Sequence, residues 1–160
     1  MKEKTCCFTG HRKIPEGEYT DIAERTQEEL IKLIKDGYRY FGAGGAIGFD
    51  TLAAWIVIKL KADYPNIRLI LVLPCKEQTK GWSEKDKNIY NQILADADKV
   101  VYTSEHYDRG CMFKRNRHLV NNSSVCICYL TEQSGGTAYT VKYAKSHGLR
   151  VINAAGCAFS

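Results

Sequence analysis

The chain has 160 residues, a length that predicts one domain spanning residues 1–160. Hydrophobic residues make up 44% and charged residues 26%, the ordinary values of a globular protein, so we do not expect a disordered chain. The formal net charge of +5 suits an anionic ligand, but the basic residues are scattered rather than gathered in a stripe. No apolar run is long enough to span a bilayer or form a signal peptide, so we expect a cytoplasmic protein without membrane attachment.

In chain order, apolar strand-like runs alternate with amphipathic helical stretches. The expected elements are a strand over 5–9, a helix over 18–35, a strand over 38–42, a helix over 48–61, a strand over 67–73, a helix capped by Ser83, a strand over 99–103, a helix near 111–122, a strand over 124–130, a helix opened by 134–136 that ends at His147, and a strand over 149–154. Continuous apolar strands alternating with helices predict a parallel sheet covered on both faces. The fold class is therefore α/β: a Rossmann-like, doubly wound, mainly parallel sheet of about six strands.

The seven cysteines form no CxxC pair and no spacing typical of zinc sites, so neither a metal site nor a disulfide is expected. Four lie inside apolar strand-like runs and are expected to be small buried hydrophobic residues: Cys6, Cys7, Cys126 and Cys128. Cys75 and Cys111 fall in a loop and at a helix start, where either one is a candidate reactive thiol.

Open α/β sheets bind ligands at the carboxyl ends of their strands, so the loops there are searched first. The loop after the first strand reads Gly10–His11–Arg12. A glycine at a strand exit lets the backbone approach a ligand, and an arginine fork suits a phosphate. His11 is placed to contact the same ligand. The alternative interpretation is a turn glycine followed by solvated basic residues.

Two glycine-rich loops each lead from a strand into a helix. Their candidate ligand-binding residues are Gly44, Gly45 and Gly48 after the second strand, and Gly135, Gly136 and Thr137 after the fifth. Backbone N–H groups at a helix start attract anions, so the two loops together predict a phosphate-bearing ligand. Neither the GxGxxG dinucleotide motif nor the GxxxxGK[ST] motif is present.

Polar and aromatic residues near these loops extend the prediction. Asp50 lies in the first turn of its helix, where it either complements the helix dipole or binds a ribose hydroxyl. One of the neighbours Arg115, Asn116 and Arg117 is expected to point at the pocket, unless that helix presents a solvated basic face. Trp82, in a polar loop, is expected either to stack on a base or to pack under the loop.

These segments, taken in order, resemble a known superfamily. The matching runs are Phe8–Arg12, Gly44–Asp50, Arg115–Asn116 and Gly135–Thr137. They resemble the SLOG superfamily, a Rossmann-like group that includes the DNA-processing protein DprA and the LOG (Lonely Guy) phosphoribohydrolases. Trp82 and the helix over 139–144 make the YpsA-like family the nearest branch, and the resemblance covers roughly residues 6–152.

The resemblance implies a nucleotide-type pocket and a binding or sensor protein. Its implied ligands are of the NAD, ADP-ribose or nucleoside-phosphate type, with no required cofactor. Its implied lining is Gly10, Arg12, Gly45, Gly48, Asp50, Arg115, Asn116, Gly135, Gly136 and Thr137. Because superfamily members are often dimers, it also implies a homodimer.

LOG enzymes carry the signature PGGxGTxxE, whose glutamate assists cleavage of the N-glycosidic bond. Here Ser134 replaces the proline and Thr140 stands where the glutamate belongs, and a threonine cannot act as a carboxylate acid or base. An N-glycosidase acting on a nucleoside monophosphate is thus the alternative function, with Asp50, Glu77 or Glu132 as a substitute carboxylate. A further alternative, by analogy with DprA, is a single-stranded DNA binder, which a net charge of +5 without a basic stripe supports less.

Overall fold

The structure, a computed structural model of the chain, describes residues 1–156. Six parallel strands form one sheet in the order β4-β3-β2-β1-β5-β6. The strands are β1 (Thr5–Gly10), β2 (Tyr40–Ala43), β3 (Arg68–Leu73), β4 (Lys99–Tyr102), β5 (Val125–Tyr129) and β6 (Arg150–Asn153). The helices are η1 (Lys2–Lys4, a 3-10 turn), α1 (Glu16–Lys35), α2 (Phe49–Leu60), α3 (Glu84–Asp96), α4 (Cys111–Asn121) and α5 (Gly136–Ser146). The predicted Rossmann-like α/β fold is confirmed, and the end of the predicted domain, residues 157–160, lies outside the described residues.

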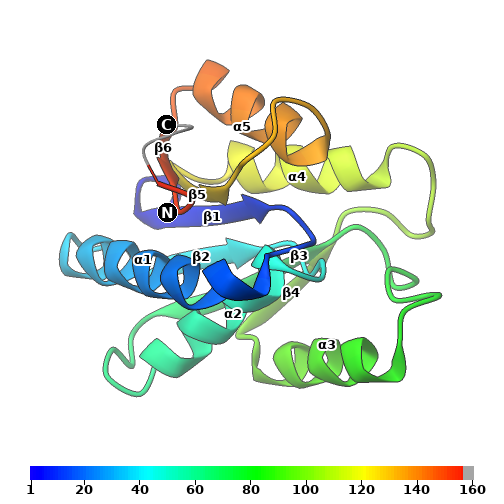
Figure 1. Cartoon of the computed structure of the whole chain (residues 1–160), viewed down its shortest axis with the longest axis horizontal. Helices are drawn as coiled ribbons and strands as arrows, with labels where there is room; N and C mark the ends of the chain where they lie inside the picture. Colours follow the sequence, from blue (N-terminus) through cyan, green and yellow to red (C-terminus); the bar gives the residue numbers. More distant parts are fainter. Residues whose placement is uncertain (157–160) are drawn as a thin grey trace.

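The strand order places a topological switch point beside β1. The chain adds β2, β3 and β4 on one side of β1, and then crosses back to add β5 and β6 on the other. The connections that follow β1 and that lead into β5 run to opposite sides of β1, so a crevice opens between them at the carboxyl ends of the strands. Sheets of this type bind ligands in that crevice. The arrow of β1 in Figure 1 points toward this edge.

Helices cover both faces of the sheet: α1, α2 and α3 lie on one side, and α4 and α5 on the other (Figure 1). Side chains alternate between the two faces along each strand, so neighbouring residues enter different cores. Phe8 packs toward α1 and α2, whereas its neighbour Cys7 packs with residues of α4 and α5 such as Val120 and Ala144. A fully buried side chain of the size of Phe8 contributes about 1.5–3 kcal/mol.

The cysteine predictions have two outcomes. The four strand cysteines are buried as predicted: Cys6, Cys7, Cys126 and Cys128. Cys75 and Cys111 are fully buried as well, and burial raises the pKa of the Cys75 thiol. Because a reactive cysteine is accessible, the burial of both side chains contradicts the interpretation of either residue as a reactive thiol.

Two segments differ from the sequence prediction. Helix α1 begins at Glu16 rather than at residue 18, because Pro15 has a φ of −57°, which suits the residue before a helix. The loop over 74–82, expected to be polar, buries Pro74, Cys75 and Gln78 beneath neighbouring elements. Across residues 1–156, no helix has the length and apolar character that crossing a membrane requires.

Candidate functional site

A cavity of about 370 Å³ lies at the carboxyl edge of the sheet, beside the switch point. We call it the central cleft. Its lining comes from the loops after β1, β2 and β5 and from α4: Thr9, Gly10, His11, Arg12, Ala46, Asp50, Met112, Arg115, Asn116, Glu132, Ser134, Gly135, Gly136 and Thr137. Segments that are far apart in sequence thus meet at the place where the fold predicts a ligand.

One wall of the central cleft is the start of α5. Gly135 is the N-cap residue, with a φ of +100° that favours glycine, and no described side chain caps the helix. A Cβ atom added at Gly135 or Gly136 would meet nothing within 4 Å, so open space lies in front of this backbone. The first N–H groups of a helix have no partner inside the helix and carry its positive dipole end. This wall is therefore suited to an anion.

Arg115 supplies a buried cation to the opposite wall. Its side chain is only 4% exposed, and it reaches across from α4 to donate a hydrogen bond from Nη1 to the Gly44 carbonyl oxygen. Its Nε donates to Oδ1 of the adjacent Asn116 at 2.7 Å. Arg115 and Asn116 therefore both line the cleft, although only one member of the basic cluster was expected to face it.

Asp50 places a carboxylate at the floor of the cleft. It is 7% exposed, and its Oδ2 accepts a hydrogen bond from the Ala46 N–H at 3.3 Å. Its Oδ1 has no hydrogen-bond partner among the described residues. Burial raises the pKa of Asp50 from its ordinary value of 3.8 to about 6, although Arg115, the Ala46 N–H and Arg12 favour the ionised form. Oδ1 is therefore a buried acceptor without a donor, which is an energetic cost to the folded chain.

His11 lines the cleft and also forms hydrogen bonds that connect the β1 loop to two other segments. Its backbone N–H donates to the Tyr129 carbonyl at 3.4 Å, and its carbonyl accepts from the Phe49 N–H at 3.1 Å. Its ring Nε2 accepts a hydrogen bond from the Thr131 N–H at 2.9 Å, which places the ring proton on Nδ1. The β1 loop is thereby bonded to the start of α2 and to the β5 loop.

The glycines of the β2 loop lie beneath the central cleft, where neighbouring groups pack closely against them. Gly44, Gly45 and Gly48 do not line the central cleft. A Cβ atom at Gly44 would lie 2.5 Å from Nη1 of Arg115, and one at Gly48 would collide with the Arg12 carbonyl oxygen. These glycines let the floor of the cleft pack closely, and the phosphate contact expected at this loop stays a prediction.

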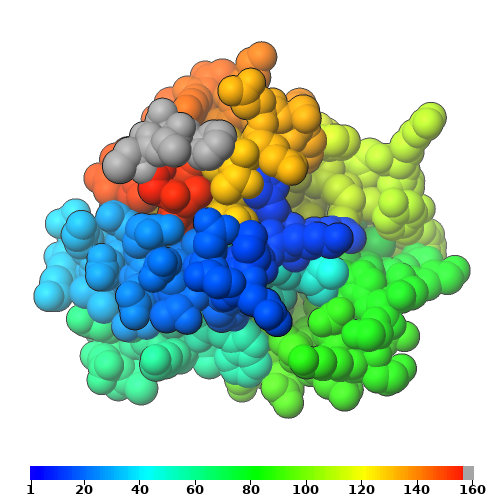
Figure 2. Space-filling view, in the orientation of Figure 1, coloured from blue at the N-terminus to red at the C-terminus, as the bar shows by residue number. Residues whose placement is uncertain are grey.

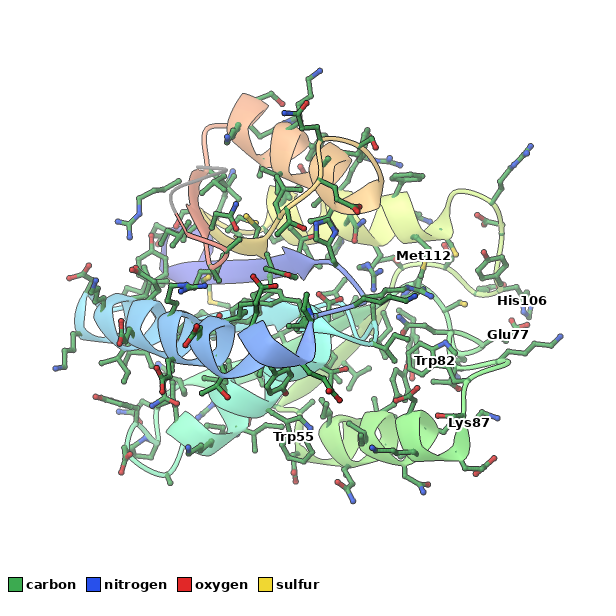
Figure 3. All side chains as sticks on the ribbon, in the orientation of Figure 1. Trp55, Glu77, Trp82, Lys87, His106 and Met112 are labelled. Atoms are coloured by element: carbon green, nitrogen blue, oxygen red, sulfur yellow. The ribbon has the colours of Figure 1, made fainter. Side chains whose placement is uncertain are left out.

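A second cavity, of about 350 Å³, adjoins the central cleft and shares Arg12 and Met112 with it. We call it the outer chamber. Its lining is Arg12, Glu77, Gln78, Lys80, Trp82, Tyr107 and Met112. Figure 3 shows Trp82, Glu77 and Met112 at the same end of the molecule, with Trp55 apart from them on α2. Trp82 meets Tyr90 edge to face, with ring centroids 5.6 Å apart, so one side of its ring is packed.

A larger and shallower hollow, of about 880 Å³, lies on the other side of the β1 loop. It shares His11, Arg12 and Glu132 with the central cleft, and Ile14 and Pro15 form its far side. In Figure 2 the blue β1 loop crosses the surface between the orange segment that leads into α5 and the green segments around α3. No charged residue lining this hollow is buried, so it forms an open shelf beside the cleft.

The sequence model of the YpsA family, described as the YspA SLOG family, matches residues 7–152. This chain belongs to the YspA SLOG family. Two Bacillus proteins illustrate the relationship. The UPF0398 protein of Bacillus pumilus (strain SAFR-032) is 30% identical over 129 residues, which cover 79% of this chain and 69% of that protein. The SPbeta prophage-derived protein YoqJ of Bacillus subtilis (strain 168) is 32% identical over 130 residues, covering 74% and 75%.

Two solved structures of DNA processing protein A share the fold of this SLOG family chain. The Helicobacter pylori protein, which binds single-stranded DNA, matches with a TM-score of 0.63 at 17% identity over 94% of this chain. The Streptococcus pneumoniae protein matches with a TM-score of 0.64 at 16% identity, also over 94% of this chain. This chain spans 64% and 50% of the length of those two proteins.

Most of the predicted site residues meet in this SLOG family structure. The central cleft brings together Gly10, His11, Arg12, Asp50, Arg115, Asn116, Glu132, Gly135, Gly136 and Thr137, and Trp82 lines the adjoining outer chamber. Glu132 is exposed at the rim of the cleft, and Glu77 is exposed and 3.1 Å from the His106 ring. The sequence did not predict Thr9, Ala46, Met112 and Ser134 as lining residues of the cleft, nor Gln78, Lys80 and Tyr107 as lining residues of the chamber.

Thr140, the residue that the resemblance to LOG enzymes sets at the position of their glutamate, has a structural role here. It is buried, and its hydroxyl donates to the Gly136 carbonyl oxygen at 2.9 Å within the first turn of α5. The helix contains no acidic residue. Of the carboxylates in the cleft, Asp50 is the buried one.

Proposed function

We propose that this chain is a nucleotide-binding protein that holds a nucleotide or a nucleotide-derived ligand, such as a compound of the NAD or ADP-ribose type, in the central cleft. The observation that carries the proposal is the meeting of an uncapped helix start, a buried arginine and an unpartnered carboxylate oxygen in one cavity. The first two groups suit a phosphate, and the third suits a sugar hydroxyl. A nucleotide carries both.

The phosphate is assigned to the start of α5. The backbone around Gly135 and Gly136 is exposed and faces open space, so an anion can approach its N–H groups closely. Arg12, exposed on the facing loop, can add a charge-assisted hydrogen bond once a ligand is bound. Arg115 adds positive charge from below without leaving its bond to Gly44.

The ribose is assigned to Asp50. Its free Oδ1 can accept a hydrogen bond from a sugar hydroxyl, which removes the cost of leaving a buried acceptor unpaired. Arg115 offsets the repulsion between this carboxylate and a phosphate, because its positive charge favours the ionised form of Asp50. The two anionic groups can therefore share one cleft.

A thermal-shift panel tests the proposal, with AMP, ADP, NAD, NADP, ADP-ribose, a cyclic nucleotide and inorganic phosphate as probes. A ligand at about a hundred times its Kd adds about 2.7 kcal/mol to stability. For a chain of this size, each kcal/mol raises Tm by about 2–4 °C, so the expected rise is about 5–11 °C. The absence of a shift with every nucleotide would refute the proposal.

Arginine variants test whether the ligand binds in the central cleft. Arg12→Ala is expected to weaken nucleotide binding about tenfold or more, since charged hydrogen bonds contribute about 1.5–3 kcal/mol. Arg150→Ala is the matched control, because Arg150 is also exposed but begins β6 at the opposite edge of the sheet. Equal loss of affinity in both variants would mean that the ligand is held by general charge and not by this cleft.

A second candidate function, an N-glycosidase acting on a nucleoside monophosphate, is favoured by one observation. Asp50 is a buried carboxyl that lines the cleft, its pKa is about 6, and one of its oxygens has no hydrogen-bond partner, which fits the requirements of a general acid or base. Release of free base from the nucleotide identified by the panel, lost in Asp50→Asn, would support this activity. Recovery of the intact nucleotide after long incubation supports a binding protein instead.

Single-stranded DNA is the remaining alternative, because the Helicobacter pylori relative in fold binds it. A short oligonucleotide in the same panel tests it. Binding through phosphate contacts weakens steeply as salt concentration rises. A salt-sensitive shift that exceeds the shift with every mononucleotide would favour DNA over the proposed ligand.

A further inference from the structure

One face of the sheet is covered by fewer helices than the other. On the first face, α2 packs on β1, β2 and β3 and is flanked by α1 and α3. On the second face, α5 packs on β1, β5 and β6, and α4 packs on β1 and β3 (Figure 1). The strip of this face beside α4, over β2, β3 and β4, holds a groove of about 180 Å³, which we call the side groove. Because sheet faces are buried by a packed layer, residues 1–156 leave the layer on this side one element short.

The floor of the side groove is apolar and only partly covered. Ile70 and Val72 of β3 and Val101 of β4 form this floor, and Leu119 of α4 forms one wall. Val72 lies beside Val101 in the strand register, so both side chains project from the same face. Leu119 fills the space over β2, where a Cβ atom added at Gly42 would lie 2.9 Å from its Cδ2. Ile70 and Val101 remain partly exposed, so a further apolar side chain placed on them would be removed from water.

The rim of the side groove is basic. Lys2, Lys99 and His118 line it, and no acidic residue within 1–156 does. Lys2 and Lys99 are exposed, and neither forms an ion pair with another described residue. Lys99 is paired in register with Ile70, which places its side chain on the same face as the apolar floor. A binding partner with an apolar side and acidic flanks therefore complements both the floor and the rim.

We propose that the side groove binds an amphipathic helix of a partner protein, with an apolar stripe on one side and acidic residues along its flanks. A helix with its side chains is about 10 Å wide, and two strand spacings are also about 10 Å, so the strip beside α4 accommodates one helix. The apolar stripe packs on Ile70 and Val101, and the carboxylates pair with Lys2 and Lys99. This is the way in which an amphipathic helix binds a hydrophobic groove.

Two other occupants match the side groove less closely. Sites for small molecules usually have volumes of roughly 300–1,000 Å³, which is larger than this groove. In a two-fold dimer the same patch faces itself, so Lys2 and Lys99 of the two copies would repel one another. The groove also lies near the amino ends of the strands, where Thr5 and Tyr40 begin β1 and β2, whereas the central cleft lies at the carboxyl ends. The inference is therefore independent of the proposed nucleotide site.

Two labelled synthetic peptides test the proposal by fluorescence anisotropy with the full chain. Each has about 14 residues, so that its helix spans about 21 Å, close to the length of the six-residue strand β3. Both place leucine at every third or fourth position, and the flanking positions carry glutamate in one peptide and lysine in the other. Glutamate and lysine have similar helix propensities, so the peptides differ mainly in the sign of their charge. The glutamate peptide is expected to bind about tenfold more tightly, and its affinity should fall as the salt concentration rises.

Substitutions test whether the peptide lies in the side groove. Lys99→Glu should weaken binding of the glutamate peptide about tenfold, because an attractive charge becomes a repulsive one. Lys85→Glu is the matched control, since it changes the net charge equally but lies exposed on α3, which covers the other face of the sheet. Val101→Thr keeps a β-branched side chain of similar shape, so β4 is expected to persist, and it should weaken binding about fivefold by placing a hydroxyl on the floor.

The contrary outcomes are distinct. Binding of neither peptide, or equal binding of both, overturns the proposal. Unchanged affinity in both Lys99→Glu and Val101→Thr means that the peptide binds elsewhere, and an equal loss in Lys99→Glu and Lys85→Glu means that only general charge attracts it. A dimer seen by analytical ultracentrifugation that Val101→Thr weakens would show that a second copy covers the groove. Displacement of the glutamate peptide by an equal concentration of octanoate would make the groove a site for small amphiphilic anions instead.

Discussion

Replacing Asp50 with asparagine should make the protein more stable at neutral pH while weakening the binding site. The folded state raises the pKa of Asp50 from 3.8 to about 6, with burial as the main cause. Each pH unit between the two values corresponds to about 1.4 kcal/mol, so the ionised carboxylate costs the native state about 3 kcal/mol. Asparagine keeps an oxygen for the Ala46 N–H and removes the buried charge.

The sign of the pH dependence follows from proton binding. A raised pKa means that the folded state binds more protons than the unfolded state between about pH 4 and pH 6. The stability that protonated Asp50 contributes is therefore fully present below about pH 4 and is lost as the pH rises through 6. The advantage of Asp50→Asn should be near zero at pH 4 and about 3 kcal/mol at pH 7.5, or about 6–12 °C in Tm.

Urea unfolding of the parent and Asp50→Asn proteins across pH 4–7.5 measures this directly. Asp98→Asn provides the contrast, because burial of Asp98 is outweighed by hydrogen bonds from Lys61 and the Leu69 N–H, and its pKa is lowered. Asp98→Asn should therefore be less stable than the parent at pH 7.5. If Asp50→Asn is also less stable at that pH, or if its effect does not change with pH, the reasoning about the buried charge is wrong.

Three further predictions concern the backbone and the thiols. Gly135→Ala and Gly148→Ala should each lower the free energy of unfolding by about 1 kcal/mol, because both glycines have a positive φ. Only Gly135→Ala should also weaken nucleotide binding, because Gly148 lies away from both cavities. Calorimetry measures both the stability and the affinity of each variant. Gly10→Ala should lower the free energy of unfolding by about 1–3 kcal/mol, because the new Cβ would lie 2.5 Å from that of Phe49; full stability in urea would contradict this packing. Cys75 should react with a thiol reagent only when the protein is unfolded, as peptide mapping by mass spectrometry will show, and rapid labelling of the native protein would contradict its burial.

The fold was predictable from the sequence because its signals are local. Apolar runs such as those that became β3 and β5 have both faces buried, and glycine or proline marks their ends. The alternation of strand and helix leaves parallel pairing as the natural outcome. The start of α1 was harder to predict from the sequence, because it depends on the geometry of Pro15 and not on apolar periodicity.

The candidate site was predictable only in part. Glycines at strand exits correctly located the loops, but a glycine required by a neighbouring side chain looks the same in sequence as one required by a ligand. Gly44 and Gly48 belong to the first kind, because Arg115 and the backbone of Arg12 occupy the space beside them. Gln78 carried no motif at all, and its place in the lining of the outer chamber depends on burial that arises only when its loop folds onto Gly44.

The bonds around His11 have a consequence for hydrogen exchange. The amides of Phe49 and Thr131 lie at loop ends, where exchange with solvent is ordinarily fast. Here each donates to His11, one to its carbonyl and the other to its ring. Both amides should therefore exchange together and at a rate close to that of the central strands.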